Sequence, residues 1–229
     1  MLNTGLGEAT YTMRCYQIAL LLENRSCLVV GAGRIAERKI ASLVDAGGRV
    51  RVVALEANPA VEAFAASGQI DLHLREYVPS DLDDAFVVIV ATDNAELNAR
   101  VSAKCHQRGI LVNVVDQPAL CSFYVPAVIE RGPVSLAIST SGASPALAKH
   151  LRVLLEDTIG EEYGQLSTLM HELRGEVRAA FAEQPERAEA WERLLQSEVL
   201  VLLRERKLDQ ARQYAREIMG LPPAATEIR

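Results

Sequence analysis

A short glycine-containing turn, Gly31-Ala32-Gly33, separates an apolar stretch typical of a strand from a segment with helical periodicity. In that context the first glycine permits the tight turn, and Gly33 leaves room for a pyrophosphate to approach the backbone. Unpaired N–H groups at the start of the helix would bind the phosphates. Ala36 stands in place of a third glycine, where the helix meets the sheet. The turn is therefore a candidate dinucleotide-binding site, although the motif alone is common.

Two further segments strengthen this interpretation because they also follow predicted strands. Glu56 lies just past the second strand, at about the spacing from which a carboxylate reaches the adenosine ribose hydroxyls. Such an acid repels a 2′-phosphate and favours NAD over NADP; the alternative is a merely solvated glutamate. Thr92 and Asp93 follow the fourth strand, at the edge of the sheet where ligands bind. Asp93 or Asn94 could equally cap the next helix.

Asp116 follows a very apolar segment, residues 110–115. A carboxylate beside such a wall can have a raised pKa and can act as a general base. The alternative is that Asp116-Gln117-Pro118 only forms a turn, and spacing alone favours that alternative.

A cluster of hydroxyl residues precedes a Ser-Pro helix start and is suited to binding a carboxylate or a phosphate. Its members are Ser139, Thr140, Ser141, Gly142 and Ser144. Helix capping alone would explain Ser144 but not the three hydroxyl residues before it. The four histidines have no ligand spacing, so we expect no dedicated metal site.

The elements that must position these residues are predicted by the pattern of apolar residues. Five short strands alternate with helical stretches, which indicates an α/β fold with a Rossmann-type parallel sheet: 27–30, 50–54, 70–74, 86–91 and 110–115. A β-hairpin follows, with strands 122–129 and 134–139 around a turn at 130–133, and then a helix opened by Ser144-Pro145 in which Leu147, Leu151, Leu154 and Leu155 share a face. The remainder reads as helices, with one apolar stripe at Leu166, Leu169, Met170, Leu173 and Val177, another beginning at Trp191, Leu194 and Leu195, and a third helix over residues 208–219. The predicted domains are residues 1–120 (nucleotide-binding), 121–158 (dimerisation region) and 159–229 (helical).

Composition excludes several other classes of protein. The 229 residues include 24 Lys plus Arg against 30 Asp plus Glu, a net charge of −6, so no broad basic surface for nucleic acid is expected. The longest apolar run, residues 85–91, is too short to cross a membrane. The four cysteines include no C-x-x-C pair and no secretory signal is evident, so the cytoplasm is the expected location.

The ordered set of these motifs closely resembles the siroheme synthase family, whose members oxidise precorrin-2 and often insert iron into the product. The segments that carry the resemblance are 27–39, 91–94, 113–116, 122–123 and 139–148. The resemblance implies that NAD⁺ binds at Gly31, Gly33, Arg34, Ile35, Leu55 and Glu56 and accepts a hydride from precorrin-2, giving sirohydrochlorin. It also implies that Fe²⁺ is a substrate if chelatase activity is present.

The resemblance further implies a role for the second half of the chain. Asp116 becomes the candidate general base, and Asn113 with the hydroxyl cluster becomes the expected site for the tetrapyrrole substrate and its carboxylates. Arg38, Lys104, Arg131 and Lys149 are weaker candidates for those carboxylates. A homodimer through the region after the nucleotide domain is implied, and the methyltransferase domain that is fused in some relatives is not expected. An alternative function is an NAD-sensing regulatory module without catalysis, and another is a dehydrogenase for a small metabolite.

Overall fold

A computed structural model describes residues 15–222 and divides the chain into two compact units. The first unit is Tyr16–Val125, and the second continues from Pro126. Within the described residues, no helix is both long and apolar enough to span a bilayer.

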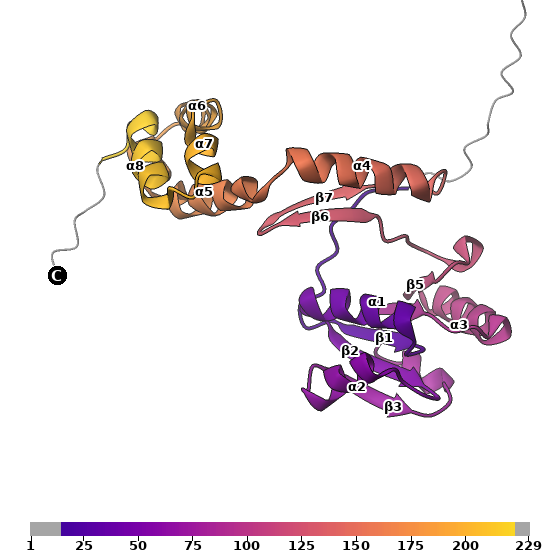
Figure 1. The fold of residues 1–229 in the computed structure, drawn as a ribbon. Helices are drawn as coiled ribbons and strands as arrows, with labels where there is room; N and C mark the ends of the chain where they lie inside the picture. Colours follow the sequence, from indigo (N-terminus) through magenta and orange to yellow (C-terminus); the bar gives the residue numbers. More distant parts are fainter. Residues whose placement is uncertain (1–14, 223–229) are drawn as a thin grey trace, which may run out of the picture. The chain divides into compact units, whose positions relative to one another are not determined.

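The first unit is a parallel five-stranded sheet with the strand order β3-β2-β1-β4-β5 (Figure 1). The strands are β1 Ser26–Val30, β2 Arg49–Ala54, β3 Ile70–Leu74, β4 Val87–Val90 and β5 Leu111–Val114. The helices are α1 Arg34–Asp45, α2 Pro59–Ala66 and α3 Ala95–Arg108, with single 3₁₀ turns η1 Pro79–Leu82 and η2 Pro118–Leu120. The predicted Rossmann-type fold is therefore confirmed, and each predicted strand lies within two residues of its observed bounds.

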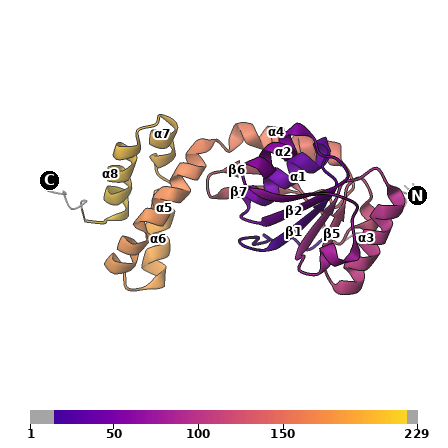
Figure 2. The ribbon, with the colours of Figure 1, turned by 90° about the horizontal axis from the view of Figure 1, so that it is seen from below.

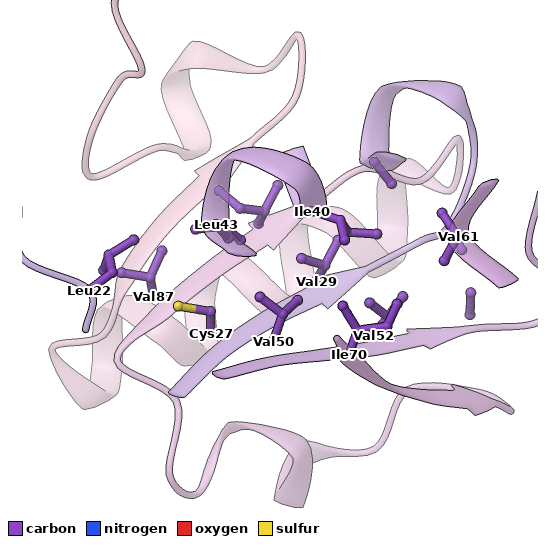
Figure 3. Close-up of a cluster of buried hydrophobic side chains, with 14 residues drawn as sticks. Leu22, Cys27, Val29, Ile40, Leu43, Val50, Val52, Val61, Ile70 and Val87 are labelled. Carbon is purple, nitrogen blue, oxygen red and sulfur yellow. The ribbon is translucent and has the colours of Figure 1, made fainter. Parts of the chain in front are cut away.

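Helices cover both faces of this sheet, which explains why its central strands β1 and β4 are almost entirely apolar, whereas β2 and β3 alternate over part of their length. On one face α1 and α2 enclose a cluster that includes Val29, Ile40 and Val61 (Figure 3). On the other face, α3 and η1 bury Val101, Cys105 and Leu82 against alternate strand residues. Figure 2 gives a second view of these layers. The sheet is thereby buried on both sides, and its carboxyl edge is left for a ligand.

The chain changes direction between β1 and β4, and this decides where a ligand can bind. β1 pairs with β2 on one side and with β4 on the other, so the connections leave β1 and β4 in opposite directions. A crevice forms at such a switch point, outside the carboxyl ends of the strands. The glycine turn after β1 and the Thr92 segment after β4 face each other there, as Gly31 shows by its contact with Ala91.

The second unit begins with an antiparallel hairpin, β6 Ala127–Arg131 and β7 Val134–Ile138. The predicted hairpin is confirmed, but its first strand begins at Ala127 rather than at residue 122, and the predicted four-residue turn was wrong. Arg131 pairs directly with Val134, so the turn contains only Gly132 and Pro133. Gly132 adopts a φ of 54°, which glycine reaches without strain, and two-residue turns of this kind match the strand twist.

Helices make up the rest of the second unit. They are α4 Pro145–Thr158, α5 Glu161–Ala180, α6 Gln184–Leu195, α7 Val199–Arg204 and α8 Leu208–Met219. The predicted apolar stripe on α5 is confirmed, because Leu166, Leu169, Leu173 and Val177 are buried in a cluster with residues of α6, α7 and α8. Of these helices, α7 is the one that the sequence pattern did not predict.

Gly164 of α5 lies directly against the hairpin turn. A Cβ atom at this position would be 2.3 Å from the carbonyl oxygen of Arg131, which is far too close. The Arg131 side chain adds a second link, since its Nε donates to the carbonyl of Ile159 at 2.9 Å, between α4 and α5. The hairpin and α5 are therefore held together by backbone contact that only a glycine permits.

Candidate functional site

A cleft of about 630 Å³ lies at the carboxyl edge of the parallel sheet, where the strand order reverses. It is lined by residues at or just after the ends of four of the five strands: Val30–Gly33 at β1, Val53–Asn58 at β2, Arg75–Tyr77 after β3, and Ala91–Asn94 with Leu97 and Arg100 after β4. Six of the predicted cofactor residues line it: Gly31, Gly33, Leu55, Glu56, Thr92 and Asp93.

The two glycines of the turn have different structural roles. Gly31 has a φ of 103°, and a Cβ atom there would lie 2.3 Å from the carbonyl oxygen of Ala91. A side chain at Gly31 is therefore excluded both by conformation and by the neighbouring strand. Gly33, in contrast, has an ordinary backbone, and a Cβ atom there would meet nothing within 4 Å. The space in front of Gly33 is open to a ligand.

Gly33 also forms the N-cap of α1, whose first turn has no side-chain cap. The first N–H groups of a helix have no partner inside the helix, and together with the helix dipole they attract anions. A diphosphate fits this position for both reasons. Arg34 and Ile35 begin the same helix and are exposed, but they are not among the residues that line the cleft.

Asn58, which the sequence reasoning missed, joins the loop after β2 to the glycine turn. Its backbone N–H donates to the carbonyl of Ala32 at 3.0 Å. Its side-chain Nδ2 donates to Glu37 Oε2 at 2.9 Å, and its Oδ1 accepts from the N–H of Val61 at 2.9 Å, which caps α2. The signal that could have identified it is Asn58-Pro59, a common start of a helix.

Leu55 and Glu56 present opposite chemistry to the cleft. Leu55 is 74% exposed although it is a large apolar residue, so its side chain is available to cover a flat apolar group. Glu56 is exposed beside it and has no ion-pair partner within residues 15–222. Its carboxylate is free to accept hydrogen bonds from ribose hydroxyls.

The segment after β4 is held by a buried amide. Thr92 Oγ1 donates to Asn98 Oδ1 at 2.6 Å, and Asn98 Nδ2 donates back to the Thr92 carbonyl at 2.9 Å. Asn94 caps α3, because its Oδ1 accepts from the N–H of Leu97 at 3.0 Å. The helix cap left open in the sequence is thus Asn94, and Asp93 stays exposed at the edge of the cleft.

Arg75 is a second residue that the sequence reasoning missed, and it follows β3 as Leu55 follows β2. Its guanidinium binds the buried carboxylate of Asp81 with two hydrogen bonds, of 2.6 and 2.9 Å. These hydrogen bonds hold the pKa of Asp81 below its ordinary value, although burial alone would raise it. The rule that ligand-binding residues follow strands could have found Arg75, whereas Arg100, within α3, gave no such signal.

The end of β5 carries Asn113 and Asp116, neither of which lines the cleft. Asn113 is buried, and its Nδ2 donates to the carbonyl of Phe123 at 3.0 Å, which holds the chain beside β5. Asp116 is exposed, has a φ of 57° and has no hydrogen-bond or ion-pair partner in the described part of the chain. Aspartate tolerates this left-handed conformation better than most residues do.

The hydroxyl cluster lies in the second unit and is largely bonded to its own loop. Thr140 Oγ1 accepts from the N–H of Ser144 and donates to its carbonyl, both at 3.1 Å. Ser139 Oγ accepts from the N–H of Ser141 at 3.1 Å, and Ser144 caps α4 by accepting from Leu147. The cluster thus forms a defined loop at the start of α4.

The basic residues named as weaker candidates differ in their availability. Arg131 is committed to the structure, because its guanidinium donates to three backbone carbonyls, those of Glu130, Glu156 and Ile159. Lys104 donates to Gln107, whereas Arg38 and Lys149 are exposed. Among residues 15–222, no group of three or more His, Cys, Asp or Glu side chains could hold a metal ion.

Three family models match this chain in the order expected for one protein family. Residues 18–127 match a model described as "putative NAD(P)-binding". Residues 131–158 match the sirohaem biosynthesis protein central region, and residues 162–219 match the sirohaem synthase dimerisation region.

Individual relatives agree with these matches. The chain is 40% identical over 201 residues to a siroheme synthase of Thioalkalivibrio sulfidiphilus, covering 88% of this chain and 41% of the relative. It is 39% identical over 211 residues to siroheme synthase 2 of Yersinia pseudotuberculosis, covering 92% and 45%. The chain thus spans less than half the length of these relatives. Among solved structures, SirC, a precorrin-2 dehydrogenase, is 28% identical with a TM-score of 0.69, covering 87% of this chain and all of SirC.

Proposed function

The chain belongs to the siroheme synthase family, and we propose from this that it is an NAD-dependent dehydrogenase that oxidises precorrin-2 to sirohydrochlorin. The observation that carries the proposal is the cleft at the switch point, in which the position of a Gly33 side chain is open space beside an uncapped helix start. A dinucleotide fits this arrangement of open backbone and unpaired N–H groups.

Each residue around the cleft then has a defined task toward NAD⁺, which supplies the hydride acceptor when bound. Gly33 and the first turn of α1 would bind the pyrophosphate, with Arg34 and Ile35 presenting their backbone N–H groups. Glu56 would accept hydrogen bonds from the adenosine ribose, and Leu55 would cover an apolar face of the nucleotide. Thr92 and Asp93 would border it on the β4 side.

We propose Asp116 as the general base that removes the proton lost during the oxidation. Its exposure, its unusual φ and its lack of a partner in residues 15–222 fit a side chain that contributes little to the fold. Backbone strain of this kind is often found at functional positions. Asn113 would help indirectly by fixing the end of β5, and the hydroxyl groups of Ser139, Ser141 and Ser144 would donate to substrate carboxylates.

The direct test is to mix the purified protein with NAD⁺ and enzymatically prepared precorrin-2 under anaerobic conditions. We expect the absorption spectrum of sirohydrochlorin to appear together with NADH absorbance at 1:1 stoichiometry. A protein that binds NAD⁺ but leaves precorrin-2 unchanged would instead be a nucleotide sensor, and the proposal would be rejected.

Iron insertion is a further activity that the resemblance to the siroheme synthase family implies, with Fe²⁺ as a substrate. The rate of siroheme formation from sirohydrochlorin and Fe²⁺ should be compared with and without the protein. Equal rates would reject chelation and leave the dehydrogenase proposal untouched.

We also propose that the protein is a homodimer. Leu147 and Leu154 on α4 are 48% and 54% exposed, and α4 packs on a hairpin too small to be stable alone. A second copy would bury these side chains. Sedimentation should give a dimer mass, and Leu154→Glu should weaken the dimer whereas Lys149→Glu on the same helix should not. A monomeric wild-type protein at micromolar concentration would contradict this.

The cytoplasm stays the predicted location.

A further inference from the structure

Arg75 and Glu56 lie at the ends of neighbouring strands, with Arg75 level with Leu55, the residue before Glu56. In the β2–β3 pair, Ala54 lies opposite Leu74, so the next residues, Leu55 and Arg75, leave the sheet side by side. Neighbouring strands are about 4.8 Å apart, so side chains from these two strand ends can reach the same ligand group. Both Glu56 and Arg75 line the cleft.

These two residue types have opposite effects on the choice of dinucleotide. A carboxylate after β2 accepts hydrogen bonds from the 2′-hydroxyl of NAD, whereas a nearby arginine accommodates the 2′-phosphate of NADP. The cleft therefore contains a residue suited to each cofactor. Whether a 2′-phosphate can bind a cation in the cleft depends on whether the Arg75 guanidinium is already paired.

Three of the five N–H groups of Arg75 donate to partners inside the protein, and two of these three hold its guanidinium on Asp81. Nη1 donates to Asp81 Oδ2 at 2.9 Å and to the carbonyl of Glu76 at 2.9 Å, and Nη2 donates to Asp81 Oδ1 at 2.6 Å. Asp81 is only 4% exposed, and its Oδ2 also accepts from the N–H of Val78 at 2.9 Å. The pair is thus fixed on the carboxylate side, although the Arg75 side chain is 40% exposed.

Drawing Arg75 toward a nucleotide phosphate would leave the Asp81 carboxylate buried and without its cation. Breaking a buried ion pair in this way costs much more than the pair contributes to stability. A 2′-phosphate at the surface, already well solvated, would gain too little to offset this cost. The guanidinium is therefore held at Asp81 and its charge is paired there, although Arg75 lines the cleft.

We propose that Asp81 is a specificity-determining residue for the cofactor, because it withholds Arg75 from the 2′-position of the bound dinucleotide. Asp81 does not line the cleft, so it acts through Arg75 as a positioning residue. Preference for NAD⁺ then has two sources, the direct repulsion by Glu56 and the sequestration of Arg75. This inference rests on the proposed function, since it concerns the same nucleotide site.

The test measures dissociation constants for NAD⁺ and NADP⁺ by calorimetry at one fixed ionic strength. Glu56→Gln removes the repulsion between the Glu56 carboxylate and a 2′-phosphate. Adding Asp81→Asn to this variant removes the carboxylate that holds Arg75. We expect Asp81→Asn to tighten NADP⁺ binding at least about tenfold in the Glu56→Gln background, as for a new charged hydrogen bond. NAD⁺ affinity should stay within about threefold, since no contact to it changes.

Two matched variants identify the cation. In the Glu56→Gln, Asp81→Asn background, Arg75→Gln should abolish the gain for NADP⁺, whereas Arg100→Gln should keep it. Arg100 lines the same cleft but makes no bond to Asp81. A gain that survives Arg75→Gln, or no gain on releasing Arg75 while NAD⁺ still binds, would overturn the inference. Failure of the wild-type protein to bind either nucleotide would overturn the proposed function itself.

A second measurement covers the case in which Asp81→Asn does not fold. In Glu56→Gln with Asp81 intact, the guanidinium ¹⁵N–H signals of Arg75 should be unchanged when the protein is saturated with 2′-AMP. Shifted or newly protected Arg75 signals would show that the arginine binds the phosphate despite Asp81, and would reject the inference.

Discussion

The side-chain amide of Asn58 lies 2.9 Å from the Glu37 carboxylate, so the loop after β2 is tied to the first turn of α1. The same residue caps α2 and binds the carbonyl of Ala32 through its backbone. One side chain thus fixes the distance between the glycine turn and the strand end that carries Glu56. This distance must match the separation of the pyrophosphate and the ribose in a bound dinucleotide.

Two replacements of Asn58 should show separately how much each of its two side-chain contacts contributes to stability. Asn58→Ser keeps a hydroxyl cap on α2 but loses the Glu37 bond, and Asn58→Ala loses both. We expect unfolding free energies to fall in that order, with about 1 kcal/mol lost per step. Urea denaturation checks the stability and calorimetry checks NAD⁺ binding, which both variants should weaken. An Asn58→Ala protein as stable as Asn58→Ser would show that the cap does not contribute.

Alanine at Gly31 and at Gly33 should have opposite consequences. Gly31→Ala places a Cβ atom against the Ala91 carbonyl at a positive φ, so the fold should lose more than about 2 kcal/mol. Gly33→Ala meets no protein atom and should leave the melting temperature within about 2 °C, while it weakens NAD⁺ binding at least about tenfold. Thermal unfolding and calorimetry on the same samples distinguish the two. Unaltered NAD⁺ affinity in Gly33→Ala would argue against a nucleotide at this turn.

Asp116→Asn should change catalysis without changing the fold. Asparagine adopts the same left-handed conformation, and the exposed Asp116 side chain makes no bond within the described residues that could be lost. Loss of a general base slows the chemical step by about 10²- to 10⁴-fold. The rate of precorrin-2 oxidation in a single turnover is the measurement, with NAD⁺ affinity and melting temperature as unchanged controls. A rate within threefold of wild type would remove Asp116 from the mechanism.

The ion pair of Asp81 with Arg75 should make stability depend on pH. Because the hydrogen bonds from Arg75 lower the pKa of Asp81 in the folded state, folding favours the ionised carboxylate. The pair therefore stabilises the fold above the ordinary pKa of 3.8, and this contribution is lost as the pH falls below it toward the lowered value. Asp81→Asn, which cannot titrate, should be less stable at pH 7 and should lose less stability between pH 5 and pH 3. Urea midpoints across this range test it, and parallel curves for the two proteins would contradict it.

The fold was predictable because strand and helix periods are local properties of the sequence. Residues 27–30 show the apolar run of a buried strand, and residues 70–74 show the apolar–polar alternation of a half-buried strand. The Ser144-Pro145 start of α4 is an ordinary capping signal. The hairpin turn was harder, because Glu130 and Arg131 are polar and read as a loop. They pair in the ladder, since polar side chains are tolerated where a small sheet faces solvent.

The site was predictable only in part, because its remaining residues depend on side-chain contacts within irregular loops, which no periodic pattern reports. The glycine turn, Glu56 and Thr92 follow strands and could be found from that rule alone. Arg75 binds Asp81 and Thr92 binds Asn98 across six residues each, and finding these pairs requires knowing how the chain folds between them. Asn113, expected at the substrate, uses its amide to hold residue 123, a contact that no local pattern indicates.

The close approach of Gly164 to the Arg131 carbonyl has a mechanical consequence. Because the two backbones are in direct contact with no side chain between them, the hairpin cannot slide along α5. A displacement of either element is transmitted directly to the other. A partner that displaces α5 would therefore displace the hairpin together with it.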